Sequence, residues 1–189
     1  MGDAFLGGGL VFEEILPLDW APGPLPQGLE LAHLNADNHQ LLSAESSLSE
    51  VHVSEALKEE SPALVHELQR LEYKLNILLR LTAELAARSS PLPPAQTVRL
   101  GAEGLEWDGP AAPAAGITGL LKIYISPALP QPLKIPCAVV GERIHDSRRI
   151  AQLKFRDLSE PVVDLIEKLI FRHHRRLVKG ARVHTPNNH

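Results

Sequence analysis

The chain of 189 residues contains a single cysteine, Cys137. One cysteine excludes an internal disulfide framework and a zinc site built from several cysteines. We expect Cys137 to be a buried structural thiol, because it lies in an apolar strand. No run of 18 apolar residues occurs, so the sequence predicts no membrane-spanning helix. The first 14 residues lack the positively charged start of a secretory signal, and we therefore expect a cytoplasmic protein.

Motifs for catalysis and for cofactor binding are also missing. No glycine-rich phosphate loop of the Walker or dinucleotide-binding type occurs. His145, Asp146 and Ser147 are triad residue types, but neighbours in a turn do not converge as triad members do. His173 and His174 are adjacent on a predicted helix and point about 100° apart, which makes a poor metal chelate. We therefore expect no enzymatic activity, no cofactor and no metal site.

Basic residues are scarce at the beginning of the chain and abundant at its end. Residues 1–60 hold 11 acids and one base, whereas residues 143–189 hold five acids and 11 bases. The net charge of −4 conceals this gradient. The basic end suits a phosphate ligand or an acidic partner, and it equally suits the acidic third of a neighbouring subunit. Charge balance does not choose between these two interpretations.

The basic end contains the strongest candidate for binding an anionic partner, either a protein or a nucleotide phosphate. Its residues are Arg172, Arg175, Arg176 and Lys179. The alternative is a solvated helix end, because the helix dipole already favours cations there. Nucleic-acid binding is not expected, since Phe171 is the one aromatic residue near the cluster and base stacking needs more.

Prolines and polar residues divide the first half of the chain. Four prolines within residues 1–26 exclude a long helix and predict an extended segment that packs on something. Residues 27–57 have a rough apolar face, weakened by Asn35, Asn38 and a serine-rich stretch, and predict one or two helices of a hairpin arm. Residues 88–96 contain three prolines and predict a linker.

The clearest pattern in the sequence lies at residues 60–87. Ser61 is a suitable N-cap and Pro62 suits the first helical position. Apolar residues then recur at spacings of four and three, a heptad pattern that keeps one face toward a partner helix. These positions, called the leucine seam below, are Leu64, Leu68, Leu71, Leu75, Leu78, Thr82 and Leu85.

The leucine seam has two interpretations. Three heptads barely separate a coiled coil from an amphipathic helix that packs on its own domain. Ile77, Leu79 and Leu81 add apolar surface beside the seam, which a bundle of helices would cover and a two-stranded coil would leave in water. We therefore predict that residues 27–88 form a helical oligomerisation region, and we favour a homotetramer.

From residue 97 the apolar pattern changes to a period of two. Short predicted strands alternate with glycine and proline turns, with no helices between them, which indicates a small closed antiparallel barrel. The strands are predicted around residues 98–100, 105–107, 120–125, 133–144 and 150–155.

A C-terminal helix follows the predicted barrel. Ser159 caps it, and Gly180 is predicted to end it. One apolar stripe for packing on the barrel consists of Val162, Leu165, Ile166, Leu169 and Ile170. The predicted fold class is α+β, with the barrel and its helix at residues 97–180 and a tail at residues 181–189.

Segments of this barrel resemble a PilZ domain, namely VRLGAEGLEW, LLKIYISPALPQPLKIPCAVV and KFRDLSEPVVDLIEKLIFRHHRRL. The resemblance covers about residues 95–180, and the preceding helical half with KLNILLRL resembles an atypical branch that has a long oligomerising helix. PilZ domains are small bacterial β-barrels with a C-terminal helix, known as receptors for cyclic di-GMP. The resemblance implies this fold and a role in bacterial motility, type IV pilus function or surface-polysaccharide control.

The PilZ family binds cyclic di-GMP with two motifs, and this sequence departs from both. The motif Asp/Asn-x-Ser-x-x-Gly falls on residues 99–104, where Arg99 replaces the acceptor, Gly101 replaces the hydroxyl and Gly104 is retained. The arginine pair of Arg-x-x-x-Arg has no counterpart on the approach to the barrel. Each lost charge-assisted hydrogen bond is worth about 1.5–3 kcal/mol. We therefore do not expect cyclic di-GMP to bind at the usual place.

Together these patterns predict a non-enzymatic, oligomeric regulatory or adaptor protein. It would act through contacts with copies of itself and with a protein partner that the sequence does not identify. The alternative is a cyclic di-GMP receptor with a non-standard site that uses Arg172, Arg175 or Arg176.

Overall fold

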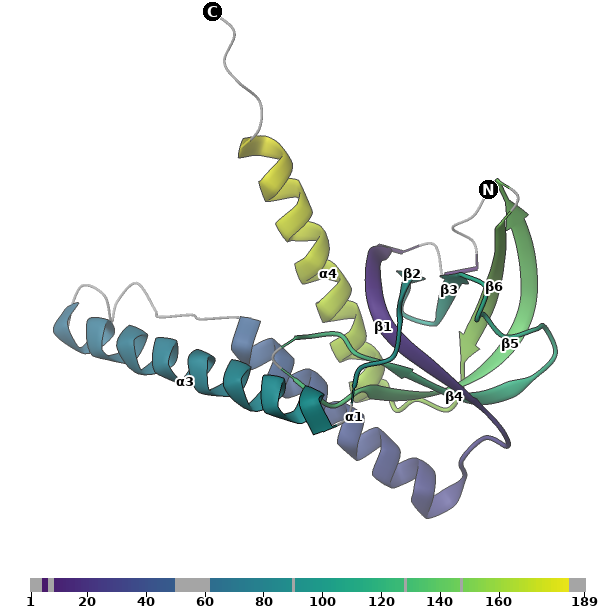
Figure 1. Cartoon of the computed structure of the whole chain (residues 1–189), viewed down its shortest axis with the longest axis horizontal. Helices are drawn as coiled ribbons and strands as arrows, with labels where there is room; N and C mark the ends of the chain where they lie inside the picture. Colours follow the sequence, from purple (N-terminus) through teal and green to yellow (C-terminus); the bar gives the residue numbers. More distant parts are fainter. Residues whose placement is uncertain are drawn as a thin grey trace, which may run out of the picture.

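A computed structural model of the chain contains a β-barrel, two helices packed on or beside it and a third helix that projects outward (Figure 1). It describes residues 5–6, 9–49, 62–89, 91–127, 129–146 and 148–183. Several predicted features fall outside this description, namely the N-cap Ser61, the turn residue Ser147, the side chain of Lys179 and most of the tail, residues 184–189. The later part of the predicted hairpin arm, residues 50–57, also lies outside it.

The described residues form a closed antiparallel barrel of six strands in the order β1-β2-β3-β6-β5-β4. The predicted fold class, α+β with a small closed barrel and a C-terminal helix, is confirmed. A β-bulge between Val139 and Gly141 shifts the register of the long β5–β6 hairpin. The strands are β1 (Phe12–Pro22), β2 (Ala95–Leu100), β3 (Gly104–Asp108), β4 (Thr118–Ile123), β5 (Leu133–His145) and β6 (Arg148–Phe155).

Strand β1 closes the barrel. The sequence predicts an extended segment here that packs on another part of the chain, but it does not identify that part. β1 pairs with β2 through Phe12–Pro17 and with β4 through Leu18–Pro22. Proline lacks the N–H that a strand interior needs, and the two prolines of β1 lie where the strand changes partner and where it ends. The barrel therefore draws one strand from the N-terminal segment and five from residues 95–155.

The core lies inside the barrel and under the C-terminal helix α4 (Glu160–Val183). Cys137 is fully buried there, as predicted, and burial raises the pKa of its thiol. Four residues of the predicted helix stripe are buried, and Leu165 is partly buried against the same core. The helix continues past Gly180, contrary to the prediction, because glycine weakens a helix by about 1 kcal/mol without removing a backbone donor.

Helix α1 (Gly28–Ser49) packs on α4 and on β5. Two asparagines that weaken its apolar pattern hold it in place. Asn38 is buried, donates to the Lys134 carbonyl at 2.7 Å and accepts from the Lys134 N–H at 3.0 Å. Asn35 accepts from the Ser159 N–H at 2.9 Å and donates to the Asp157 carbonyl at 3.1 Å. These contacts join α1 to β5 and to the start of α4.

Helix α3 (Pro62–Ser89) begins at the predicted proline and projects away from the barrel (Figure 1). Among the described residues, extensive packing between elements involves α1, α4 and the strands, but not α3. Because a helix in water needs a covered apolar face, this arrangement leaves α3 with apolar surface to bury elsewhere.

Candidate functional site

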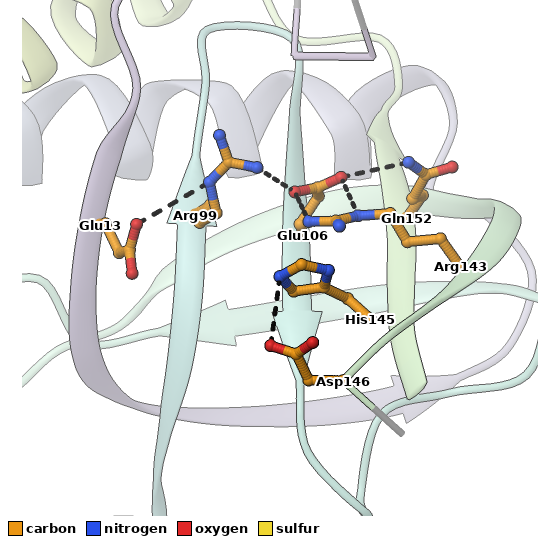
Figure 2. Close-up of polar contacts among 7 residues, drawn as sticks. All are labelled: Glu13, Arg99, Glu106, Arg143, His145, Asp146 and Gln152. Carbon is orange, nitrogen blue, oxygen red and sulfur yellow. Dashed lines mark hydrogen bonds and ion pairs between the residues drawn. The ribbon is translucent and has the colours of Figure 1, made fainter. Parts of the chain in front are cut away.

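Polar side chains form one row across the outer face of the barrel (Figure 2). Strand register places Glu13 opposite Arg99, Arg99 opposite Glu106, and Glu106 opposite Gln152. Directly opposed residues of antiparallel strands lie close enough for their side chains to interact. Arg143 reaches into the same row from β5, so five strands contribute to it.

Glu106 lies at the centre of this row, and its side chain has no exposed surface. It accepts a hydrogen bond from Arg99 Nη1 at 2.6 Å, two from Arg143 Nε and Nη2 at 3.0 Å each, and one from Gln152 Nε2 at 3.1 Å. Burial alone would raise the pKa of Glu106. The hydrogen bonds from Arg143 and Gln152 and the charges of Arg143 and Arg99 outweigh burial, so this pKa is lowered and the carboxylate is ionised.

The residues of the degenerate nucleotide motif are engaged within the chain itself. Arg99 pairs with Glu106 and lies 3.9 Å from Glu13. A Cβ on Gly101 would come within 2.7 Å of the Leu6 carbonyl oxygen, and Leu6 is buried. A Cβ on Gly104 would lie 2.7 Å from the Leu153 carbonyl oxygen. The N-terminal segment therefore covers the place where the motif would present a serine hydroxyl.

The leucine seam lies on the exposed surface of α3. Its six leucines are between 42% and 61% exposed, and Thr82 is exposed with its hydroxyl donating to the Leu79 carbonyl at 2.8 Å. Large apolar side chains in a repeated row on one helix are a sign of an interface. The seam thus remains uncovered within one copy of the chain.

The side of α3 that is buried within the same chain differs from the leucine seam. Val65 and Ala83 are buried, and they lie on one face because they are about five full helical turns apart. Successive helical residues are about 100° apart, so Val65 lies about 100° around the helix from Leu64. The seam therefore does not coincide with the side of α3 that is buried in this chain.

The predicted basic cluster on α4 divides into residues with different surroundings. The Arg172 side chain is 12% exposed, forms an ion pair with Glu45 on α1 and donates to Ser46 Oγ at 2.6 Å. Arg175 is exposed and lies 5.8 Å above the Phe171 ring, and Arg176 is exposed beside a cavity. The structure thus places Arg172 in the contact between α1 and α4, and Arg175 and Arg176 at the surface.

A largely apolar cavity of 750 Å³ lies between β1, the end of α3, the loop before β5 and α4. His173 forms part of its wall, with its ring edge-on to Phe12 at 3.9 Å between centroids. Burial lowers the pKa of His173, the nearby charge of Glu14 raises it, and that of Arg176 lowers it further. The imidazole is therefore favoured in its neutral form.

The described parts of the chain contain neither a cluster of metal ligands nor a membrane-spanning helix. No group of three or more histidine, cysteine, aspartate or glutamate side chains there could hold a metal ion. No helix in the same residues is long and apolar enough to cross a membrane. The predicted turn is present at Asp146, which adopts a positive φ of 49°. Its carboxylate oxygen Oδ2 lies 3.6 Å from Nε2 of His145.

Sequence reasoning identified Arg99 but missed Glu106, Arg143 and Gln152. The sequence predicts strands around residues 98–100 and 105–107 with a glycine turn between them, and counting outward from that turn places Arg99 opposite Glu106. That count could have revealed the first pair. Arg143 and Gln152 could not be found in this way, because their positions depend on the bulge in β5 and on the pairing of β3 with β6.

Comparison with known proteins gives a family and similar solved structures. A family model described as the atypical PilZ domain, cyclic di-GMP receptor, matches residues 45–183. A crystal structure of a pathogenic protein from Xanthomonas campestris is similar over 92% of both chains, with 26% sequence identity and a TM-score of 0.68. It is described as a new tetrameric PilZ domain self-assembled via an unusual helical bundle. No curated protein sequence matches the chain.

Proposed function

The chain belongs to the atypical PilZ domain family, and we propose that it is a non-enzymatic regulatory or adaptor protein that assembles through helix α3. The observation that carries this proposal is the leucine seam, which is exposed along the whole of α3 in a single copy. Fully burying an exposed leucine side chain contributes about 1.5–3 kcal/mol. The six leucines are 42–61% exposed, so covering the rest of their surface between copies contributes about half of this amount for each of them. The expected setting is the bacterial cytoplasm, in control of motility, type IV pili or surface polysaccharide.

A tetramer is the assembly that we favour. The relative from Xanthomonas campestris, similar over nearly the whole chain, is described as tetrameric and assembled through a helical bundle. In the present chain, Leu81 beside the seam is also 47% exposed. A four-helix bundle covers a wider apolar face of each helix than a two-stranded coil does.

The assembly proposal is tested by placing charge in the leucine seam. Replacement of Leu71 and Leu78 by glutamate puts two carboxylates into the proposed interface, and desolvating them there should dissociate the protein to a single chain. The matched control replaces Gln69 and Asn76 by glutamate, since both residues are exposed on the same helix with the same spacing. Light scattering coupled to gel filtration measures the mass of each variant.

The expected result is a monomer for the seam variant and an unchanged assembly for the control, with helix content by circular dichroism preserved in the control. If the seam variant keeps the wild-type mass, the seam does not hold the copies together and the proposal fails.

Regulation through the usual nucleotide motif is not part of this proposal. Arg99 is bound to Glu106 at 2.6 Å, and Leu6 lies against Gly101. A nucleotide at this position would have to break a charge-assisted pair and displace a buried leucine, each of which costs free energy. These contacts support action through protein partners.

The second candidate is a cyclic di-GMP receptor with a non-standard site. It is favoured by the description of the family as a cyclic di-GMP receptor and by the exposed guanidiniums of Arg175 and Arg176. Arg172 is less suited to this role, because Glu45 and Ser46 already hold its guanidinium.

Titration calorimetry with cyclic di-GMP separates the two candidates. Our leading proposal predicts no saturable heat at micromolar nucleotide with the wild-type chain. Saturable binding that disappears in Arg176→Ala and persists in Arg148→Ala would favour the receptor, because Arg148 is an exposed arginine that belongs to β6 and not to α4.

A further inference from the structure

The surroundings of Glu106 are those of a bound anion rather than those of an ordinary surface carboxylate. Two guanidiniums and one amide converge on its two oxygens from β2, β5 and β6 (Figure 2). Arg143 binds it in the two-pronged way in which arginine holds carboxylates and phosphates in proteins.

We propose that Arg99 and Arg143 form an anion-binding site whose resident anion is the Glu106 carboxylate, and that removing this charge opens the site to a tetrahedral dianion such as sulfate or phosphate. The inference is independent of the proposed assembly through α3, because all three residues lie on the barrel. Glu106 is thus the residue that decides whether this site accepts an external anion.

Access from solvent favours this assignment. Although Glu106 has no exposed surface, the side chains of Arg99 and Arg143 are 26% and 30% exposed. Both arginines line a pocket of 410 Å³ on the outside of the barrel, together with Thr97 and His145. A small anion can therefore reach the outward edges of both guanidiniums without unfolding a strand.

The charges around the pocket explain why the wild-type site is closed. Glu106 compensates the positive charges of the two guanidiniums that hydrogen-bond to it. Of the other carboxylates that line the pocket, Glu13 is exposed and lies 3.9 Å from Arg99, and Asp108 pairs with Arg148 at 3.4 Å. A neutral side chain at position 106 would leave Arg99 its contact with Glu13 but would take from Arg143 the carboxylate that now neutralises it, and a soluble dianion would replace that lost charge.

The test uses the full-length variant Glu106→Gln, which keeps the shape of the side chain and removes its charge. Thermal unfolding is measured in millimolar sodium sulfate and in sodium chloride of equal ionic strength. An anion present at 100 times its dissociation constant for the site should raise the melting temperature of a chain of this size by roughly 5–10 °C. We expect this rise in Glu106→Gln and not in the wild type.

Glu103→Gln is the matched control, because Glu103 is an exposed glutamate at the same turn that pairs with Lys154 instead of an arginine. It loses the same charge and should behave as the wild type does, which corrects for the general stabilisation that sulfate gives to proteins. Adding Arg143→Gln to Glu106→Gln should abolish the sulfate response.

Two results would overturn the proposal. One is a sulfate-dependent rise in melting temperature that is equal in Glu106→Gln, the wild type and Glu103→Gln, or the absence of such a rise in all three proteins. The other concerns a Glu106→Gln chain that fails to fold in chloride. Sulfate during refolding, or the added Arg143→Gln change, should then rescue folding, and failure of both would mean that the carboxylate is needed for its geometry and not for its charge.

Discussion

At the scale of single residues, the polar contacts on the outer face of the barrel centre on one buried carboxylate, that of Glu106. Glu106 is stable as an anion because two arginines and a glutamine satisfy its oxygens. Burial of an ion pair costs free energy, and complete hydrogen bonding is what offsets that cost. The sequence places an acid opposite Arg99 across a tight turn, but it does not reveal that the acid is covered, since Arg143 and Gln152 come from strands far along the chain.

The lowered pKa of Glu106 predicts an acid-dependent loss of stability. A carboxylate whose folded-state pKa lies below its ordinary value of 4.5 stabilises the fold fully above that pH. The stabilisation is lost as the pH falls through the folded-state pKa. We expect the free energy of unfolding in urea to fall more steeply below about pH 4.5 for the wild type than for Glu106→Gln. Parallel curves for the two proteins would contradict this role of Glu106.

At the scale of elements, apolar periodicity predicted helices and strands where one face is buried or repeated. The heptads predicted α3, and the period of two predicted five of the strands. β1 was predicted as extended but not as a barrel strand, because its prolines and its pairing with two different strands leave no simple alternation. Asn35 and Asn38 weakened the pattern of α1 because their role is to bind backbone groups of other elements.

Docking of α1 on the barrel gives a prediction at this scale. Asn38→Ala leaves the part-buried N–H and carbonyl of Lys134 without their side-chain partner, and each such unsatisfied group costs about 1–2 kcal/mol, the lower part of the range for buried groups. We expect the free energy of unfolding to fall by about 2–4 kcal/mol in chemical denaturation. Asp37→Ala, at the exposed neighbouring position, should change it by less than about 0.5 kcal/mol. Equal effects of the two substitutions would show that the Asn38 bridge is not what docks the helix.

At the scale of the whole molecule, one copy of the chain combines a closed barrel with the projecting helix α3 (Figure 1), and the leucine seam of that helix is exposed. The sequence predicted both parts, because each rests on a periodic pattern. It could not show on which side the seam would lie, since that depends on which residues of α3 the rest of the chain buries. Val65 and Ala83 are buried and mark the side of α3 that packs within the chain, and the seam lies away from that side.

Sedimentation equilibrium of the full-length wild-type chain over a wide concentration range tests the assembly directly. A four-helix bundle of α3 helices predicts a mass of four times 20.7 kDa at micromolar concentration, with dissociation at most on strong dilution. A mass of 20.7 kDa that does not change with concentration would contradict self-association through the leucine seam.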